Sequence, residues 1–565
     1  MQKIILTSRK LKDAVEKTTR KWKAIVVGVD VDVASFMTSS RVIDALEKID
    51  IRKDDIIIVP GNFTESTARI SRETGAACYK GTKNLSDLTI LLEYMDDKSK
   101  TQGGVVELKN ELSQVSSADK IIESRIFENI KKSLGSMYEY KGSGGIKKTM
   151  IGKLTLNGIP RIMAEIVDAP LLTCDEIAEK TRLYIKQGAD IIDIGMTPKA
   201  DAESVGNIVK TVKSSIEKYR RNFKEIAVSI DTTDSGEILR GVEQGVDMLV
   251  SIDESNYTVL GEIENIKKLL PEKNNGKRNK TKLPVVLIPR NKSGEIVKHN
   301  ERIIFLENLI KKINHEFNQG EIFEFIIDPI LDPPNYGLFK SLICYFNFRQ
   351  RHPEIPIMMG VGNVSELMDA DSAGMNALLC ALAFEIQTDI VLTPQYSEKA
   401  KYSVMEMKRA VEMMFISHTR GQPPKDLGID LILFGDKKCA PLAVHEPGFD
   451  DPSSIEKFTD TADPGFGKIP VKYDSGFFKI FLKENKIFAV YYPNSKKTGR
   501  GIGFAGVDAD VIYRNIIESP GISISLQHAA YLGKELFRAE TALKCGKCYE
   551  QERELFPGIS KFLKN

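Results

Sequence analysis

Charge of one sign, long apolar runs and cysteine are all scarce in this sequence. Eighty Lys and Arg residues nearly balance 78 Asp and Glu residues, so no positive excess indicates nucleic-acid binding. No apolar run approaches the ~20 residues of a transmembrane helix, and the first residues do not resemble a signal peptide. Seven cysteines, an odd number in 565 residues, argue against a disulfide framework and are typical of a reducing compartment. We therefore predict a cytoplasmic protein that binds no membrane and no nucleic acid.

The composition is that of a globular protein, with 42% hydrophobic and 28% charged residues. A chain of 565 residues is too long for one domain. The stretch 141–145 is rich in Gly and predicts a flexible connector, and strand and helix patterns alternate before it, as in α/β layer domains. We therefore predict an N-terminal α/β domain over residues 1–145, a central domain over 150–418 and a C-terminal domain over 425–565.

The C-terminal segment combines strand patterns with a helix pattern. A hairpin is predicted over 475–492, with its turn near Glu484-Asn485, and a further strand over 430–435. A helix is predicted over 528–543, so the domain is expected to be α+β. Cys545 and Cys548 form a lone C-x-x-C pair, which we interpret as a helix-end turn because no second pair accompanies it.

The central segment repeats one pattern, in which a short apolar run leads to an aspartate and then to a turn or helix signal. The clearest example is Gly188–Gly195, which contains Asp193 and is bounded by glycines. Such runs are typical of parallel strands buried on both faces. Eight strands are predicted, over 161–167, 190–195, 226–231, 247–252, 284–288, 323–328, 357–360 and 389–393. A helix pattern follows each strand, and eight such units over roughly 250 residues predict a (β/α)8 TIM barrel.

In a TIM barrel the functional side chains lie at the carboxyl ends of the strands. The residues placed there are Glu165, Asp168, Asp193, Asp231, Ser251, Asp253, Arg290, Asp328 and Asn363. They include no histidine, no metal-ligand spacing and no G-x-S-x-G nucleophile elbow. Convergent carboxylates suit a flat heterocycle with several N–H donors, because a carboxylate accepts two parallel hydrogen bonds. Helix N-capping is the alternative for a single strand-end aspartate, and for Asp231 the sequence does not separate the two.

Three of these strand motifs carry a family resemblance: Gly188-Ala-Asp-Ile-Ile-Asp-Ile-Gly195, Val228-Ser-Ile-Asp-Thr232 and Ile326-Ile-Asp-Pro329. They resemble successive strand motifs of dihydropteroate synthase, a pterin-binding (β/α)8 barrel that joins a dihydropterin diphosphate to an aromatic amine. Asp328-Pro-Ile-Leu-Asp-Pro333 and Gly360-Val-Gly-Asn-Val-Ser365 are similar to motifs of methyltetrahydrofolate–corrinoid methyltransferases, which use the same barrel. These similarities cover the central half of the chain, whereas the whole chain resembles an archaeal family described as dihydropteroate-synthase-related.

The resemblance implies roles for individual residues. Asp231 matches the pterin-binding aspartate of the third strand, and Asp328 matches the acid that holds the amino-pyrimidine edge of the pterin. Asn363 matches the methyltransferase asparagine that hydrogen-bonds the pterin ring. The fourth-strand asparagine that both families share is absent here, so Ser251 or Asp253 could substitute for it.

A synthase must neutralise the charge on its departing diphosphate. The candidate cations are Lys199, Arg290, Lys399 and Lys401, whereas the Ser-Arg-Lys and Arg-x-His motifs of the synthases are missing. The first-strand Asn-Val-Thr-Pro, which belongs to the metal-assisted diphosphate site of the synthases, is Val167-Asp-Ala-Pro170 here. The resemblance to the synthases implies Mg²⁺ as a possible cofactor, but the residues show no metal-ligand set, and we name no catalytic residue.

The resemblance thus implies a transferase that binds a reduced pterin and condenses a dihydropterin diphosphate with an arylamine in folate or tetrahydromethanopterin biosynthesis. The predicted substrate-binding residues are Asp193, Asp231, Ser251, Asp253, Asp328, Asn363, Lys199, Arg290 and Lys399. Two alternatives stay open: methyl transfer between a methyl-tetrahydropterin and a corrinoid, and pterin binding without catalysis. A homodimer is a possible assembly.

Overall fold

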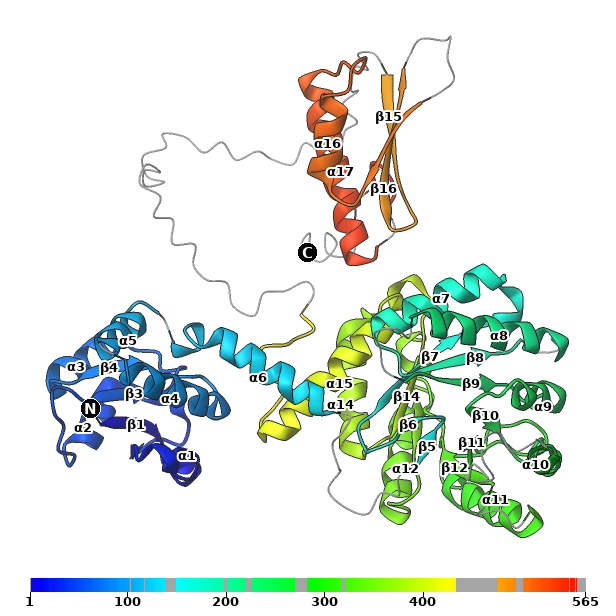
Figure 1. Ribbon diagram of the computed structural model, residues 1–565, viewed down its shortest axis with the longest axis horizontal. Coiled ribbons are helices and arrows are strands. Elements are labelled where there is room, and N and C mark those ends of the chain that lie inside the picture. Colours follow the sequence, from blue (N-terminus) through cyan, green and yellow to red (C-terminus); the bar gives the residue numbers. More distant parts are fainter. Residues whose placement is uncertain are drawn as a thin grey trace. The chain divides into compact units, whose positions relative to one another are not determined.

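The computed structural model describes residues 2–101, 103–115, 117–137, 149–197, 202–219, 225–269, 282–317, 322–432, 476–493, 501–547, 549–553 and 555 (Figure 1). The chain divides into two compact units. The first contains Met1–Leu367, Gly374–Thr393 and Val404–Leu431, and the second contains Met368–Ala373, Pro394–Ser403 and Ile432–Asn565. The domain ranges predicted from the sequence stay a prediction, because the N-terminal sheet and the barrel fall in the same unit.

The N-terminal part of the first unit is a parallel sheet with strand order β2-β1-β3-β4. Its strands are β1 (Lys3–Ser8), β2 (Ile25–Val29), β3 (Ile56–Val59) and β4 (Ala77–Lys80), and its helices are α1 (Lys12–Thr19), α2 (Ser39–Leu46), α3 (Ala68–Thr74), α4 (Leu85–Ser99), α5 (Gly104–Ser113) and α6 (Glu123–Ser136). Alternate residues of β1 belong to two separate apolar clusters, Ile4 with α2 and α3, and Ile5 with α4 and α5. Helices therefore cover both faces of this sheet. Neither β1 nor β4 was predicted from the sequence.

Eight parallel strands form the barrel, in the order β12-β11-β10-β9-β8-β7-β14-β13. They are β7 (Arg161–Ile166), β8 (Ile191–Gly195), β9 (Ala227–Asp231), β10 (Met248–Ile252), β11 (Leu283–Leu287), β12 (Phe323–Ile327), β13 (Met358–Gly360) and β14 (Ile390–Pro394). A parallel bridge between Ile327 and Ile357 joins the two ends of this order, so the sheet closes on itself. The predicted fold class is confirmed, and each strand lies within one residue of its predicted range at both ends.

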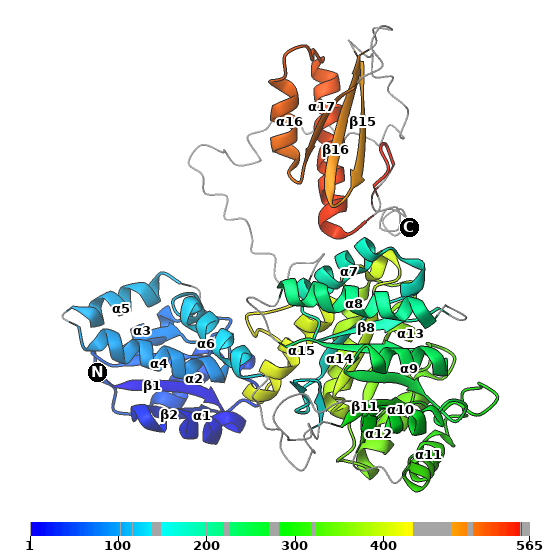
Figure 2. The ribbon, with the colours of Figure 1, turned by 45° about the vertical axis from the view of Figure 1, so that its right-hand side comes forward.

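Helices alternate with these strands and surround the barrel (Figure 2). They are α7 (Cys174–Gln187), α8 (Ala202–Tyr219), α9 (Ser235–Glu243), α10 (Val259–Leu269), α11 (Arg302–Phe317), α12 (Leu338–Arg351), the short α13 (Gly362–Ser365), α14 (Ser372–Ile386) and α15 (Ser403–Arg420). The ends of α7 show why the helix could be predicted from the sequence. Thr173 and Glu176 form a capping box at its start, and Gly188, with a φ of 105°, ends it directly before β8.

Aspartates at the strand starts hold neighbouring strands together. In three cases an aspartate that precedes one strand accepts a hydrogen bond from a backbone N–H of the strand beside it. The pairs are Asp190 with Ile162 (3.0 Å), Asp247 with Val228 (2.9 Å) and Asp389 with Ile357 (3.0 Å). These carboxylates serve the fold, and they lie at the amino ends of the strands.

An apolar layer fills the amino end of the barrel interior. A hairpin of β5 (Met150–Ile151) and β6 (Leu154–Thr155) packs into it against Met163, Ile191, Ala227, Met248, Val250, Val286, Ile326, Met358 and Ile390. Because side chains alternate along a strand, the residues two positions later also face the interior. On β7 and β8 these are Glu165 and Asp193, and directly after β12 it is Asp328. The fold therefore directs three acids into the barrel beyond the apolar layer.

The second unit contains an antiparallel sheet of β15 (Gly476–Lys483), β16 (Lys486–Pro493) and β17 (Ile502–Gly506), with α16 (Ala509–Ile517) and α17 (Leu526–Cys545). Both helices cover one face of the sheet (Figures 1 and 2). Phe478 and Ile480 of β15 belong to the same apolar cluster as Leu532 of α17. Glu484 and Asn485 form the hairpin turn with φ values of 51° and 56°, as a type I′ turn requires.

The hairpin and α17 were predicted from the sequence, whereas β17 and α16 were missed. Residues 430–432 form no strand, and the rest of the strand predicted over 430–435 lies outside the described residues. Cys545 ends α17 and Gly546 follows with a φ of 65°, as the helix-end interpretation predicted, and Cys548 is not among the described residues. No helix in the described part of the chain is long and apolar enough to span a bilayer.

Candidate functional site

Three acids from neighbouring strands converge at the carboxyl end of the barrel. Glu165 lies on β7, Asp193 on β8 and Asp231 at the end of β9, and one oxygen of each carboxylate lies within 4.8 Å of the other two. The strand register explains the convergence, since Glu165 pairs with Asp193 and Gly195 pairs with Asp231. We call these three residues the acid cluster.

Asp193 is the most enclosed member of the acid cluster, with 0% of its surface exposed. Its Oδ1 accepts a hydrogen bond from the hydroxyl of Ser229 at 2.6 Å. Its Oδ2 is buried and has no hydrogen-bond partner among the described residues. Gly195 allows the close approach of the neighbouring acid, because a Cβ at this position would lie 2.5 Å from Glu165 Oε1.

Burial and mutual repulsion make the acid cluster hard to ionise completely. Burial, together with the charges of Asp231 and Asp168, raises the pKa of Glu165 to about 7. Burial, Asp231 and Glu165 raise the pKa of Asp193 well above its ordinary value. Burial also raises the pKa of Asp231, although a hydrogen bond from Ser251 and the charge of Arg290 oppose this rise. Near neutral pH the cluster therefore binds protons or needs an external positive charge.

Asp328 follows β12 and is a further buried acid at this end. Its Oδ1 accepts hydrogen bonds from the Tyr345 hydroxyl of α12 and from the Ile330 backbone N–H at 2.8 Å. Its Oδ2 accepts none from the described residues, and a Cβ on Gly360 would lie 3.8 Å away. Burial raises the pKa of Asp328 to about 6. Asp328 therefore keeps one carboxylate oxygen for a ligand.

Arg302 on α11 fixes the loop that carries Asp328. Its guanidinium donates to the carbonyls of Pro329 (3.1 Å) and Ile330 (2.8 Å), and to Oδ1 of Asp332 (3.0 Å). Ile330 has a φ of 65°, which is strained for a β-branched residue. The loop is therefore held in one conformation by the buried Arg302.

A bulge redirects the end of β10. The pairing of β10 with β11 shifts between Leu249 and Ile252, and Ser251 within this stretch has a φ of 62°. The buried Asn256 stabilises the bulge, since its Nδ2 donates to the Ser251 carbonyl (3.1 Å) and its Oδ1 accepts from Asp253 N (2.8 Å). Ser251 can then donate to Asp231 of the acid cluster.

The other predicted site residues have different environments. Asp253 is fully buried and Oδ2 accepts a hydrogen bond from Arg290 Nε at 2.6 Å, so these two residues pair with each other. Asn363 lies on α13, and its Nδ2 donates to the Leu331 carbonyl at 2.8 Å. Lys399 lies in the second unit, where its Nζ donates to the Met368 carbonyl. Lys199 lies outside the described residues.

Sequence reasoning missed several residues that shape this site. Tyr345 lies within α12, where the sequence pattern predicts a buried helix face and gives no sign of a contact with Asp328. Arg302 and Asn256 look like ordinary polar residues of a helix and a loop. Ser229 was the one with a visible signal, because it precedes Asp231 by two positions on the same strand and therefore shares its face.

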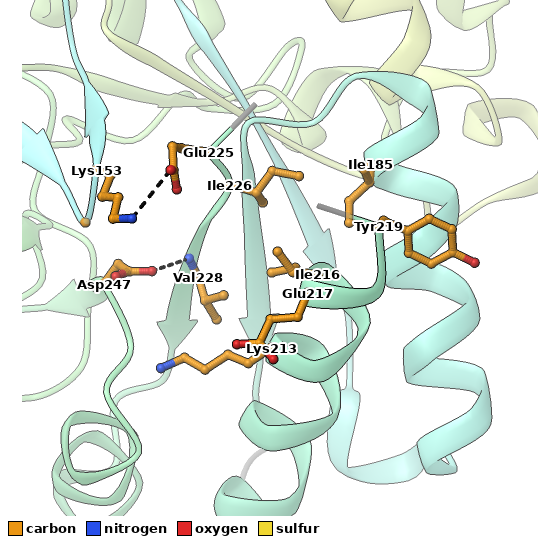
Figure 3. Close-up of a pocket in the computed structure, with 11 residues that line it drawn as sticks. Lys153, Ile185, Lys213, Ile216, Glu217, Tyr219, Glu225, Ile226, Val228 and Asp247 are labelled. Atoms are coloured by element: carbon orange, nitrogen blue, oxygen red, sulfur yellow. Dashed lines mark hydrogen bonds and ion pairs between the residues drawn. The ribbon is translucent and has the colours of Figure 1, made fainter. Parts of the chain in front are cut away.

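A cavity of about 290 Å³ lies at the other end of β9 (Figure 3). Its charged lining residues are largely paired: Lys153 lies 3.5 Å from Glu225, and Asp247 accepts from Val228 N at 2.9 Å. Lys213 Nζ donates to the Gln244 carbonyl at 2.9 Å. Active sites of TIM barrels lie at the carboxyl ends of the strands, whereas residues at the amino ends serve stability. We therefore assign this cavity no function.

Two sequence families match parts of this chain. The family described as "Pterin binding enzyme" matches residues 168–274, a range that contains Asp193 and Asp231. The family described as "PterinBD-DUF4346" matches residues 473–552 in the second unit.

One curated relative is similar over nearly its whole length. The chain is 33% identical over 572 residues to "Uncharacterized protein MJ0107" of Methanocaldococcus jannaschii, covering 98% of this chain and 97% of the relative. Similar solved structures include Yersinia pestis dihydropteroate synthase with a pterine-sulfa conjugate (14% identity, TM-score 0.36, 48% of this chain and 100% of that chain) and Coxiella burnetii dihydropteroate synthase with pteroic acid (16%, 0.34, 49% and 99%). The chain belongs to the pterin-binding, dihydropteroate-synthase-like family that includes MJ0107.

Proposed function

We propose that this chain binds a reduced pterin at the carboxyl end of the barrel and uses it in a dihydropteroate-synthase-like condensation. The observation that carries the proposal is the pair of inward-facing acids Asp231 and Asp328. Oδ1 of Asp328 is occupied by Tyr345 and Ile330, whereas Oδ2 keeps both lone pairs for donors. The guanidine-like edge of a pterin supplies such donors, and hydrogen bonds to an ionised carboxylate are strong.

In the proposed reaction the arylamine nitrogen attacks the methylene carbon of the dihydropterin that bears the diphosphate. The C–N bond forms as the C–O bond breaks, diphosphate leaves with the electron pair, and the amine loses a proton. In tetrahydromethanopterin biosynthesis the second substrate would be an arylamine ribosyl phosphate. Arg290 and Lys199 are the residues proposed to hold phosphate groups, and Mg²⁺ accompanying the diphosphate would neutralise its developing charge.

One observation favours a second candidate. Arg290 already pairs with the buried Asp253 at 2.6 Å, so its charge is partly neutralised before a diphosphate binds. Methyl transfer between a methyl-tetrahydropterin and a corrinoid needs the same pterin site but no diphosphate site. A binder without catalytic activity would need the pterin site alone.

Turnover assays on the purified chain distinguish these functions. The synthase proposal expects diphosphate release that requires both a dihydropterin diphosphate and an arylamine. Formation of a methyl-corrinoid from a methyl-tetrahydropterin would show that the chain is a methyltransferase and not a synthase. Calorimetric binding of a reduced pterin with neither turnover would indicate a binder, and no binding of any reduced pterin would refute the proposal. Mass spectrometry of the small molecule that co-purifies with the chain identifies its ligand. Light scattering of the purified chain tests for a homodimer.

A further inference from the structure

We propose that Glu165, Asp193 and Asp231 form a binding site for one hard divalent cation that is held by the protein itself, with no pterin or diphosphate present. The sequence predicted no metal-ligand set, because the three acids come from three strands and show no short spacing. The barrel register is what brings them together. The inference shares Asp193 and Asp231 with the proposed pterin site, but it does not rest on that function.

The spacing of the three oxygens fits a hard cation. One oxygen of each acid lies within 4.8 Å of the other two. Ligand distances of about 2.1 Å for Mg²⁺ and about 2.4 Å for Ca²⁺ put adjacent oxygens about 3.0–3.4 Å apart and opposite oxygens at most about 4.2–4.8 Å apart, so 4.8 Å is the widest spacing that one such cation can bridge. Three carboxylate oxygens on one side leave the other coordination positions to water or substrate, which is how Mg²⁺ and Mn²⁺ are commonly bound.

A second observation is independent of this spacing. Asp193 is fully buried, its Oδ1 is occupied by Ser229, and its Oδ2 has no hydrogen-bond partner among the described residues. A buried carboxylate oxygen without a partner is costly, since buried charges in proteins are usually paired or coordinate metals. Gly195 leaves the space in which Glu165 Oε1 approaches this position.

No described basic residue supplies the missing charge. The charged neighbours that act on Glu165 and Asp193 are all acids. Arg290 acts on Asp231, but its guanidinium is held 2.6 Å from Asp253. A divalent cation would neutralise two of the three charges and give Asp193 Oδ2 its partner.

Mn²⁺ binding to the metal-free full chain tests the site. Electron paramagnetic resonance counts free and bound Mn²⁺ at pH 7.5, and Mg²⁺ and Ca²⁺ serve as competitors. We expect one bound Mn²⁺ per chain with no pterin added. Asp193→Asn keeps the hydrogen bond from Ser229 but removes a ligand charge, and it should weaken binding by more than the about 10- to 100-fold typical of outer-shell changes.

Asp168→Asn is the matched control. Asp168 carries the same charge near Glu165 but is not one of the three ligands. Asn tolerates its φ of 50°, so the fold should not change. We expect this variant to change Mn²⁺ affinity by about threefold or less, because the lost charge is not a ligand and its effect on the cation is screened.

Thermal melting provides the second readout. Mn²⁺ should raise the melting temperature of the wild type and of Asp168→Asn but not that of Asp193→Asn, which lacks a ligand charge. Glu165→Gln, at a half-buried position, replaces Asp193→Asn if the latter does not fold. Absence of Mn²⁺ binding to folded wild type, as expected if protons alone neutralise the cluster, overturns the proposal. Unchanged Mn²⁺ affinity in both Asp193→Asn and Glu165→Gln would also overturn the proposal. A separate pterin titration then shows whether the proposed function survives.

Discussion

Replacing Asp328 by Asn tests the pterin site at its best-defined acceptor. The Asn oxygen can still accept from the Tyr345 hydroxyl and from Ile330 N, which lies 2.8 Å from Oδ1. Its amide NH₂ then occupies the position of Oδ2 and faces the donors of the pterin. Such a mismatch at a buried polar contact costs about 2–4 kcal/mol. The Kd for a reduced pterin should therefore rise about 30- to 1,000-fold.

The same substitution has an opposite effect on stability. The pKa of Asp328 is raised by burial to about 6, whereas an unfolded aspartate titrates near 3.9. Between about pH 4 and pH 6 the folded protein binds more protons than the unfolded chain, so the free energy of unfolding falls as pH rises. A shift of two units corresponds to about 3 kcal/mol, fully lost above pH 6. Asn cannot ionise, so the variant should melt above the wild type at pH 7.5 without ligand.

Calorimetric titration of a dihydropterin at pH 7.5, with circular dichroism as the folding check, measures the first effect. Tyr345→Phe is the control, because it removes the hydroxyl that donates to Oδ1 and leaves Oδ2 in place. It should destabilise the fold by about 1–3 kcal/mol and weaken pterin binding less than Asp328→Asn does. A folded Asp328→Asn variant that binds pterin as tightly as the wild type would show that Asp328 is structural and that the reasoning is wrong.

Three further predictions follow from the same geometry. Reduced-pterin binding should weaken as pH falls below about 6, because protonation of Asp328 turns its ligand-facing acceptor neutral; a flat calorimetric profile from pH 5 to 8 would contradict this. Arg290→Met should weaken a diphosphate-bearing dihydropterin by about 1.5–3 kcal/mol more than the bare pterin, and equal losses would argue against a phosphate role. Gly195→Ala places a Cβ 2.5 Å from Glu165 Oε1 and should displace that carboxylate; the chain should stay folded by circular dichroism but lose Mn²⁺ affinity, and unchanged affinity would remove Glu165 from the cation site.

Much of the barrel follows from local patterns. Gly188 ends α7, Asp190 ties β8 to its neighbour, and the apolar run that follows is long enough for one buried strand. The same sequence of signals recurs around the barrel, so the strands could be placed to within one residue. No turn or helix signal precedes β1, and β17 contains Gly503 and Gly506 among its five residues, so it does not form an apolar run.

The acids at the strand ends were also visible in the sequence, because Asp193 interrupts an apolar run and Asp328 ends one. Their environments were not visible. Only the register of β7, β8 and β9 brings Glu165 beside Asp193 and Asp231. Only the bulge in β10 turns Ser251 towards Asp231 and leaves Asp253 to pair with Arg290.

The sequence by itself therefore determined the strand order along the chain, the parallel α/β architecture and the end of the barrel at which the acids gather, because each depends on short-range periodicity and turn chemistry. The tertiary structure decided which acid oxygens remain without partners. Tyr345 reaches Asp328 from a helix, and Ser229 reaches Asp193 from the neighbouring strand. Hydrogen bonds and repulsion between residues far apart in the chain depend on distances of a few ångströms, which no local pattern contains.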